Sequence, residues 1–95
     1  MAPVMEKSEL SDLKDQIDSL VNAFTKKEAR PLYNRLNSQA SNLRGEINPR
    51  YHGKLMEAID FAWMGSGQVQ DKDHWISQME AAWYTFEGGV GNSIV

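Results

Sequence analysis

The sequence predicts an all-α fold, a small antiparallel bundle of about four helices arranged around one central helix. The central helix is predicted over Leu55–Met64, an apolar stretch interrupted only by Glu57 and Asp60. Because these two acids stand three residues apart, they share one narrow face and leave the rest of the helix apolar. Such a helix must be covered on most sides. The flanking segments show helical spacing of apolar residues and no strand-like alternation.

Length and composition indicate one folded domain. The chain has 95 residues, of which 41% are hydrophobic and 24% charged, as is typical of a globular protein. We expect a single helical domain over residues 1–95, with flexible ends at residues 1–7 and 88–95. The absence of cysteine excludes disulfides and favours a cytoplasmic location. No apolar segment approaches the roughly 20 residues that span a bilayer, so we expect a soluble protein without membrane contact.

The first helix is predicted to begin near Ser8, a common N-cap residue. Its apolar side chains alternate at spacings of three and four residues: Leu10, Leu13, Ile17, Leu20 and Phe24. Acids near its start and Lys26 and Lys27 near its end suit the helix dipole. The apolar stripe is too short to require a coiled coil, so we expect it to pack within the bundle.

Between Thr25 and Pro31 the chain must break or bend. The segment from Thr25 to Glu28 has the form of a capping box, which would start the second helix at Thr25. Pro31 favours a later start, because inside a helix its ring clashes with the carbonyl four residues back. We prefer a tight corner with the second helix beginning near Pro31. The alternative is one long kinked helix, which would favour an extended dimer.

The other helix boundaries follow from capping residues and glycines. The second helix is expected to fray or stop at Gly45, after burying one helical face: Leu32 or Tyr33, Leu36, Ala40, Leu43 and Ile47. Asn48-Pro49 predicts an N-cap followed by proline at the first helical position, which opens the central helix. Gly65-Ser66-Gly67 is expected to end that helix.

The fourth helix is expected to be capped by Asp71 or Asp73 and to stop at Gly88-Gly89. Its inward face is predicted to consist of large apolar side chains: Trp75, Met79, Ala82, Trp83 and Phe86. Tyr84 falls on a different flank. Because a single core is not expected to cover both flanks, we predict Trp75, Trp83 and Tyr84 as interface aromatics and a homodimer at micromolar concentration.

The sequence offers no recognisable catalytic or metal site. His52 and His74 lie in different helix starts without a metal-binding spacing. Asp71, Asp73 and His74 could share a cation, but acids at a helix start more often act as caps. There is no cysteine, serine elbow or phosphate loop. We therefore predict no enzyme, no metal and no cofactor.

Charge is unevenly distributed along the chain, whose formal net charge is −3. A basic segment over residues 26–54 lies between acidic ends, which favours attraction between neighbouring helices of opposite sign. The alternative is an anion-binding surface that would serve nucleic acid. A pI near 5.3 and the lack of a helix-turn-helix motif argue against this alternative.

A polar stripe is predicted on the second helix, where five residues recur at spacings of four, three, four and three: Arg30, Asn34, Asn37, Ser41 and Arg44. Asparagine and serine are poor helix formers, so their presence here needs a compensation. Arginine and asparagine make bidentate contacts with bases, phosphates and carboxylates. The stripe is therefore a candidate binding site, and a polar seam against a neighbouring helix is the alternative.

These observations favour a small non-enzymatic protein-interaction module, an adaptor, inhibitor or regulatory subunit that acts through a helical surface. The alternative function is a nucleic-acid-binding helical module that uses residues 26–54. A protein partner is expected, with nucleic acid less favoured.

Overall fold

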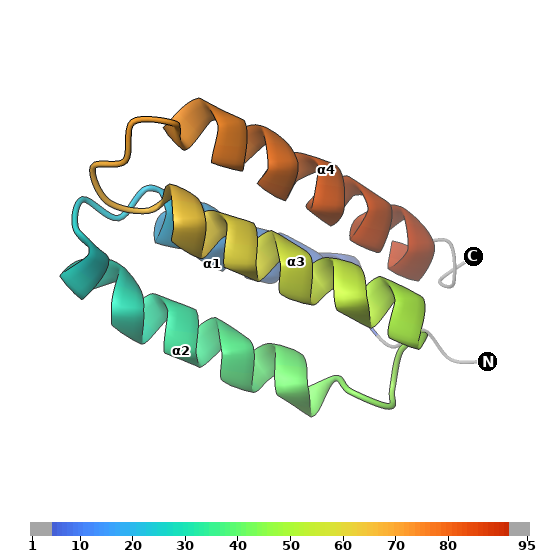
Figure 1. Ribbon diagram of the computed structural model, residues 1–95. Coiled ribbons are helices and arrows are strands. Elements are labelled where there is room, and N and C mark those ends of the chain that lie inside the picture. Colours follow the sequence, from blue (N-terminus) through green and yellow to red (C-terminus); the bar gives the residue numbers. More distant parts are fainter. Residues whose placement is uncertain (1–4, 92–95) are drawn as a thin grey trace.

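The computed structural model describes residues 5–91 as four α-helices joined by short connections (Figure 1). The helices are α1 (Lys7–Val21), α2 (Lys26–Asn42), α3 (Pro49–Gly65) and α4 (Lys72–Gly91). Consecutive helices run in opposite directions, and the described residues form no strand beyond an isolated bridge between Arg44 and Ile47. The predicted all-α antiparallel bundle is confirmed.

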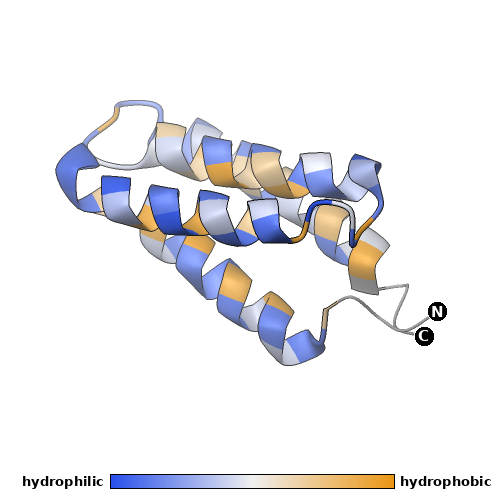
Figure 2. Cartoon of the chain, turned by 90° about the horizontal axis from the view of Figure 1, so that it is seen from below, coloured by the Kyte–Doolittle hydropathy of each residue, from blue (hydrophilic) through white to orange (hydrophobic). Residues whose placement is uncertain are grey.

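Helix α3 is the centre of the bundle, as predicted. It packs against α1, α2 and α4, whereas α2 and α4 lie on opposite sides of it and make no contact within the described residues (Figure 1). Its buried side chains form one continuous arc: Leu55, Ala58, Ile59 and Ala62. Glu57 and Asp60 are exposed. Figure 2 shows the corresponding pattern, with hydrophobic residues in interrupted stripes along the helices.

The predicted start of the second helix at Pro31 is wrong, and the capping-box alternative holds. The Thr25 hydroxyl accepts a hydrogen bond from the Glu28 N–H at 3.1 Å, and α2 begins at Lys26. Pro31 lies inside α2, where it cannot donate to the carbonyl of Lys27. Because Lys27 is exposed, water can reach that carbonyl. Phe24 lies in the corner and is 68% exposed, so it does not continue the buried stripe of α1.

The start of the central helix is confirmed. The Asn48 side chain accepts a hydrogen bond from the Arg50 N–H at 2.9 Å, and Pro49 is the first helical residue. Helix α2 already ends at Asn42, so Ile47 reaches the core from the connection between the helices. Gly45 makes that connection possible because its φ of 86° is a backbone conformation that other residues avoid.

The predicted stop of the fourth helix at Gly88-Gly89 is wrong, because α4 continues to Gly91. Packing explains the difference: Gly89 lies so close to the Tyr51 ring that an added Cβ would overlap it, and Val90 is buried. These contacts offset the low helix propensity of glycine. Residues 1–4 and 92–95 of the predicted flexible ends lie outside the described residues, while Met5 is buried.

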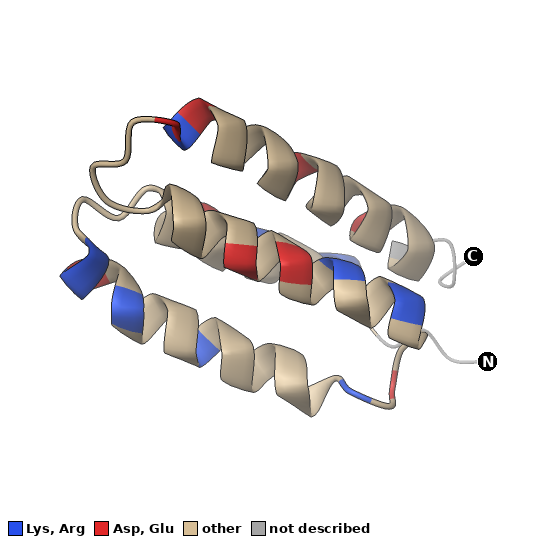
Figure 3. Cartoon of the chain, in the orientation of Figure 1, with Lys and Arg blue, Asp and Glu red and all other residues tan. Residues whose placement is uncertain are grey.

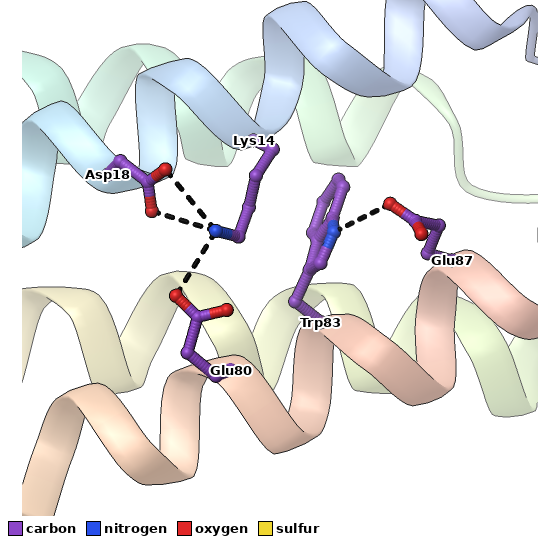
Figure 4. Close-up of polar contacts among 5 residues, drawn as sticks. All are labelled: Lys14, Asp18, Glu80, Trp83 and Glu87. Atoms are coloured by element: carbon purple, nitrogen blue, oxygen red, sulfur yellow. Dashed lines mark hydrogen bonds and ion pairs between the residues drawn. The ribbon is translucent and has the colours of Figure 1, made fainter.

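A half-buried lysine connects α1 with α4 (Figure 4). The Lys14 ammonium donates hydrogen bonds to Asp18 at 2.9 Å and to Glu80 at 3.1 Å. Burial disfavours its charge, but the hydrogen bonds and negative charges of the two carboxylates outweigh this and raise the pKa of Lys14. Trp83 lies beside this group, and its indole N–H donates to Glu87 at 3.0 Å.

Two glycines of α3 should respond oppositely to substitution by alanine. A Cβ at Gly65 would stand 2.9 Å from the Trp75 Cβ and 3.0 Å from a Val21 methyl group, whereas a Cβ at Gly53 would have no atom within 4 Å. We expect Gly65→Ala to lower the free energy of unfolding by about 1–3 kcal/mol. Gly53→Ala should raise it by about 0.5–1 kcal/mol. Urea denaturation measures both, and a stabilising Gly65→Ala would contradict the close packing described for α3 and α4.

Candidate functional site

The polar stripe lies on an open flank of α2. Four of its side chains are exposed and Asn37 is half-buried. Arg44 lies just beyond the helix end, where its backbone N–H donates to the Ser41 carbonyl. None of the five side chains makes a hydrogen bond or ion pair with another residue in the range 5–91. The stripe is therefore exposed along its length instead of packed as a seam between helices.

At its N-terminal end the stripe meets an aromatic and cationic cluster centred on Trp63 of α3. The Trp63 ring stacks on Tyr33 of α2 with centroids 4.9 Å apart, and the Tyr33 hydroxyl donates to Asp60 at 2.9 Å. The Lys26 ammonium lies 4.6 Å from the centroid of the Trp63 ring, and the Arg30 guanidinium lies 5.6 Å from it. We call the stripe together with this cluster the α2–α3 face.

Helical spacing produces the cluster. Lys26, Arg30 and Tyr33 are separated by four and three residues, so they project from one side of α2. Asp60 and Trp63 are three residues apart on α3, and the antiparallel arrangement brings the end of α3 against the start of α2 (Figure 1). Each cation above an exposed aromatic ring contributes about 0.5–1 kcal/mol. The Arg30 guanidinium lies over the Trp63 ring while its N–H donors make no hydrogen bond in the described structure.

Two lysines bind the ends of α1 and α3. The Lys72 ammonium donates to the carbonyls of Val21 and Gly65, both at 2.7 Å, and to that of Gly67 at 3.2 Å. Lys26 donates to the Trp63 carbonyl and, at 2.9 Å, to the Ser66 hydroxyl. The last carbonyls of a helix lack intrahelical partners and carry partial negative charge, so both ammoniums act as C-terminal caps.

The pair of Lys26 and Ser66 has the composition of a serine–lysine nucleophile but not its accessibility. Burial, followed by repulsion from Lys72, lowers the pKa of Lys26, as such a base requires. However, Ser66 has no exposed surface, and its hydroxyl donates to the Trp63 carbonyl at 2.6 Å. A substrate cannot reach this hydroxyl in the described structure, so the pair serves to close the end of the bundle.

The histidines and acids named from the sequence do not converge. His52 is buried and its Nε2 lies 2.8 Å from the Ala40 carbonyl oxygen, which the ring N–H binds. His74 is exposed and packs edge-on against Trp75. Within residues 5–91, no group of three histidine, aspartate or glutamate side chains is placed to hold a metal ion.

The three predicted interface aromatics lie in different environments. Trp83 is buried in the core, and Trp75 is half-buried against Phe61, with ring centroids 6.0 Å apart. Tyr84 is 79% exposed. Of these three, Tyr84 is the most exposed.

The cluster around Trp63 was not predicted, because Trp63 belongs to the apolar stretch assigned to the core. The position of Trp63 around the helix could have indicated that it reaches the surface. It follows the buried residue Ala62 by 100° and so lies at the edge of the buried arc of α3. Its pairing with Tyr33 required the register between α2 and α3, which the sequence does not show.

The basic segment lies mainly along α2 and the start of α3, and the acids of α3 follow in the middle of that helix (Figure 3). Lys54 forms an ion pair with Glu57 at 3.3 Å. The lysines and arginines of α2 have no ion pair with any described residue. The charges of Lys27, Arg30 and Arg35 are therefore available at the surface, whereas Lys26 caps the end of α3.

Replacing Lys72 tests its role as a cap. Lys72→Met should lower the free energy of unfolding by about 1–3 kcal/mol, because three carbonyls lose a charged donor. Lys27→Met is the matched control: Lys27 is exposed and without a partner in the described structure, so a change within about 0.5 kcal/mol is expected. Chemical denaturation compares the two variants. Equal stabilities would show that the carbonyls do not depend on Lys72.

Comparison with known proteins found no matching family model, no matching curated protein and no matching solved structure. No helix in residues 5–91 combines the length and apolarity that crossing a membrane requires.

Proposed function

We propose that this protein is a small non-enzymatic interaction module, an adaptor, inhibitor or regulatory subunit, which binds a protein partner through the α2–α3 face. One observation carries the proposal. The polar stripe makes no side-chain hydrogen bond or ion pair within the described residues, and it ends at the Tyr33–Trp63 stack, where Arg30 lies over the Trp63 ring.

The composition of the cluster supports a protein partner. Tryptophan, tyrosine and arginine are the residue types that contribute most binding energy in protein interfaces. Tyr33 and Trp63 are half-buried, so each ring is fixed by the fold and still offers apolar area to a partner. The exposed polar stripe beside them corresponds to the polar rim of such an interface.

The stripe also supports binding because its residues lower the stability of α2 and no contact within the described structure offsets this loss. Asn34, Asn37 and Ser41 have poorer helix propensity than the alanine, glutamate or lysine that exposed helix positions often carry. Hydrogen bonds within the fold would offset this loss, and the described structure contains none for these side chains. Hydrogen bonds to a partner would offset it instead.

Nucleic acid remains the alternative partner, since stacked aromatics beside lysine and arginine also bind single strands. Asp60 and Glu57 argue against it, because both are exposed on the neighbouring surface of α3 and would repel phosphates. Salt distinguishes the two functions. Nucleic-acid binding weakens steeply between 50 and 200 mM salt, whereas a contact centred on aromatic side chains weakens little.

Reversing charge in the stripe tests the proposal. Arg30→Glu with Arg44→Glu should change the free energy of unfolding by no more than about 1 kcal/mol, since only the Arg30 stacking contact is lost. Capture of the partner from the source cells should fail. Arg35→Glu is the control, because Arg35 is also exposed and unpaired within the described part of α2 but lies outside the stripe. A double variant that captures every wild-type partner would exclude the stripe as the binding site.

Self-association is a second form of protein binding that the exposed ring of Tyr84 favours. We expect light scattering behind a sizing column to give a dimer mass at micromolar concentration, and Tyr84→Arg to give the mass of one chain. A wild-type protein that has the mass of one chain at all concentrations would contradict the homodimer.

A further inference from the structure

We infer that the partner segment that binds the α2–α3 face is an acidic helix, with carboxylates opposite Arg30 and Arg44 and a large apolar residue beside Trp63. This inference rests on the proposed function and adds the chemistry of the partner. It follows from the unpaired cations, the length of the stripe and the acids next to it.

Arg30 and Arg44 favour a partner that carries carboxylates or phosphates. The Arg30 guanidinium is held 5.6 Å from the centroid of the Trp63 ring, and neither Arg30 nor Arg44 has an ion pair within the described residues. A guanidinium offers parallel N–H donors that match a carboxylate or a phosphate. Because Arg30 is already positioned, a partner loses less entropy in binding it than in ordering a free side chain.

The length of the stripe favours an elongated partner over a small ligand. Twelve residues separate Arg30 from the end of α2 at Asn42, which corresponds to about 18 Å at the 1.5 Å rise of a helix, and Arg44 lies just beyond that end. A small anion cannot reach both arginines. A partner helix of about 14 residues can, and a helix laid along a helical surface is a common mode of peptide recognition.

The residues between the two arginines and on the neighbouring part of α3 have small side chains. Asn34, Asn37 and Ser41 are short side chains that both donate and accept hydrogen bonds. On α3, Gly53 is exposed, and an added Cβ there would have no atom within 4 Å. Gly53 precedes Asp60 by seven residues, or two helical turns, so both lie on the same side of α3.

The apolar contact is expected at the end of the bundle that holds Trp63. Met64 is 45% exposed and Phe24 is 68% exposed. Phe24 belongs to that end because its carbonyl accepts a hydrogen bond from Gln68, in the connection that follows α3. A large apolar side chain of the partner would cover this exposed surface.

The acids of α3 favour a protein over a phosphate backbone. Asp60, which binds the Tyr33 hydroxyl at 2.9 Å, and the neighbouring Glu57 are both exposed. A nucleic acid carries a charge on every nucleotide and would bring phosphates against these carboxylates. A helix can place carboxylates only opposite the arginines and a neutral or basic side chain opposite Asp60.

Site-specific photo-crosslinking in the source cells tests this inference. A photoreactive amino acid at Asn37, and in a second variant at Asn34, should cross-link to a protein segment that is rich in aspartate and glutamate. Arg35 is the matched control position, because it is exposed but points about 100° away from Asn34 and about 160° away from Asn37 around the helix. Only variants that keep the melting temperature of the wild type are compared.

A charge swap completes the test. Arg30→Glu should abolish the cross-link at Asn37, and replacing the facing carboxylate of the partner by arginine should restore it. Cross-links to neutral or basic protein segments, or a cross-link that the swap does not restore, would overturn this inference and leave the proposed function intact. Cross-links to nucleic acid, or none above the level at Arg35, would overturn both.

Discussion

The apolar character of α3 is the constraint on which the rest of the structure depends. A helix with one narrow polar face must be covered on its other sides, and three helices are available to do so. The bundle meets this need by placing α1, α2 and α4 against α3, which leaves α2 and α4 apart. Because α4 never reaches α2, the flank of α2 that carries the polar stripe stays uncovered. The candidate binding surface is thus a result of how the core is enclosed.

The two sides of α3 are packed in different ways. Toward α4, glycine allows close approach: Gly65 lies against Trp75, and Gly89 of α4 lies against the Tyr51 ring. Toward α2, half-buried aromatic rings meet at the surface, beside cations that have no carboxylate partner in the described structure. The first contact excludes water and fixes the helices. The second leaves apolar area and charge accessible.

Local signals predicted the structure wherever they agreed with one another. Asn48 and the proline after it both indicate a helix start, and α3 begins there. At Pro31 the local signals conflict, and the cap before it prevails because the lost hydrogen bond falls at an exposed first turn. The sequence predicts a helix stop at Gly89, because nothing local shows the contact that keeps this residue helical. That contact, with the Tyr51 ring, joins distant parts of the chain. The cluster at Trp63 also depends on helix register, so the sequence predicted the stripe but not the aromatic group at its end.

The separation of charge between the helices has a consequence for the rate of encounter. Lysines and arginines gather along α2 and the start of α3, while α1 and α4 are predominantly acidic (Figure 3). Such a distribution gives the molecule an electric dipole despite its small net charge. Within a Debye length of about 8 Å at physiological ionic strength, this field turns the α2 side toward an approaching anionic surface. Collisions with the proposed acidic partner would then begin in a productive orientation, before any side chain of the stripe has made contact.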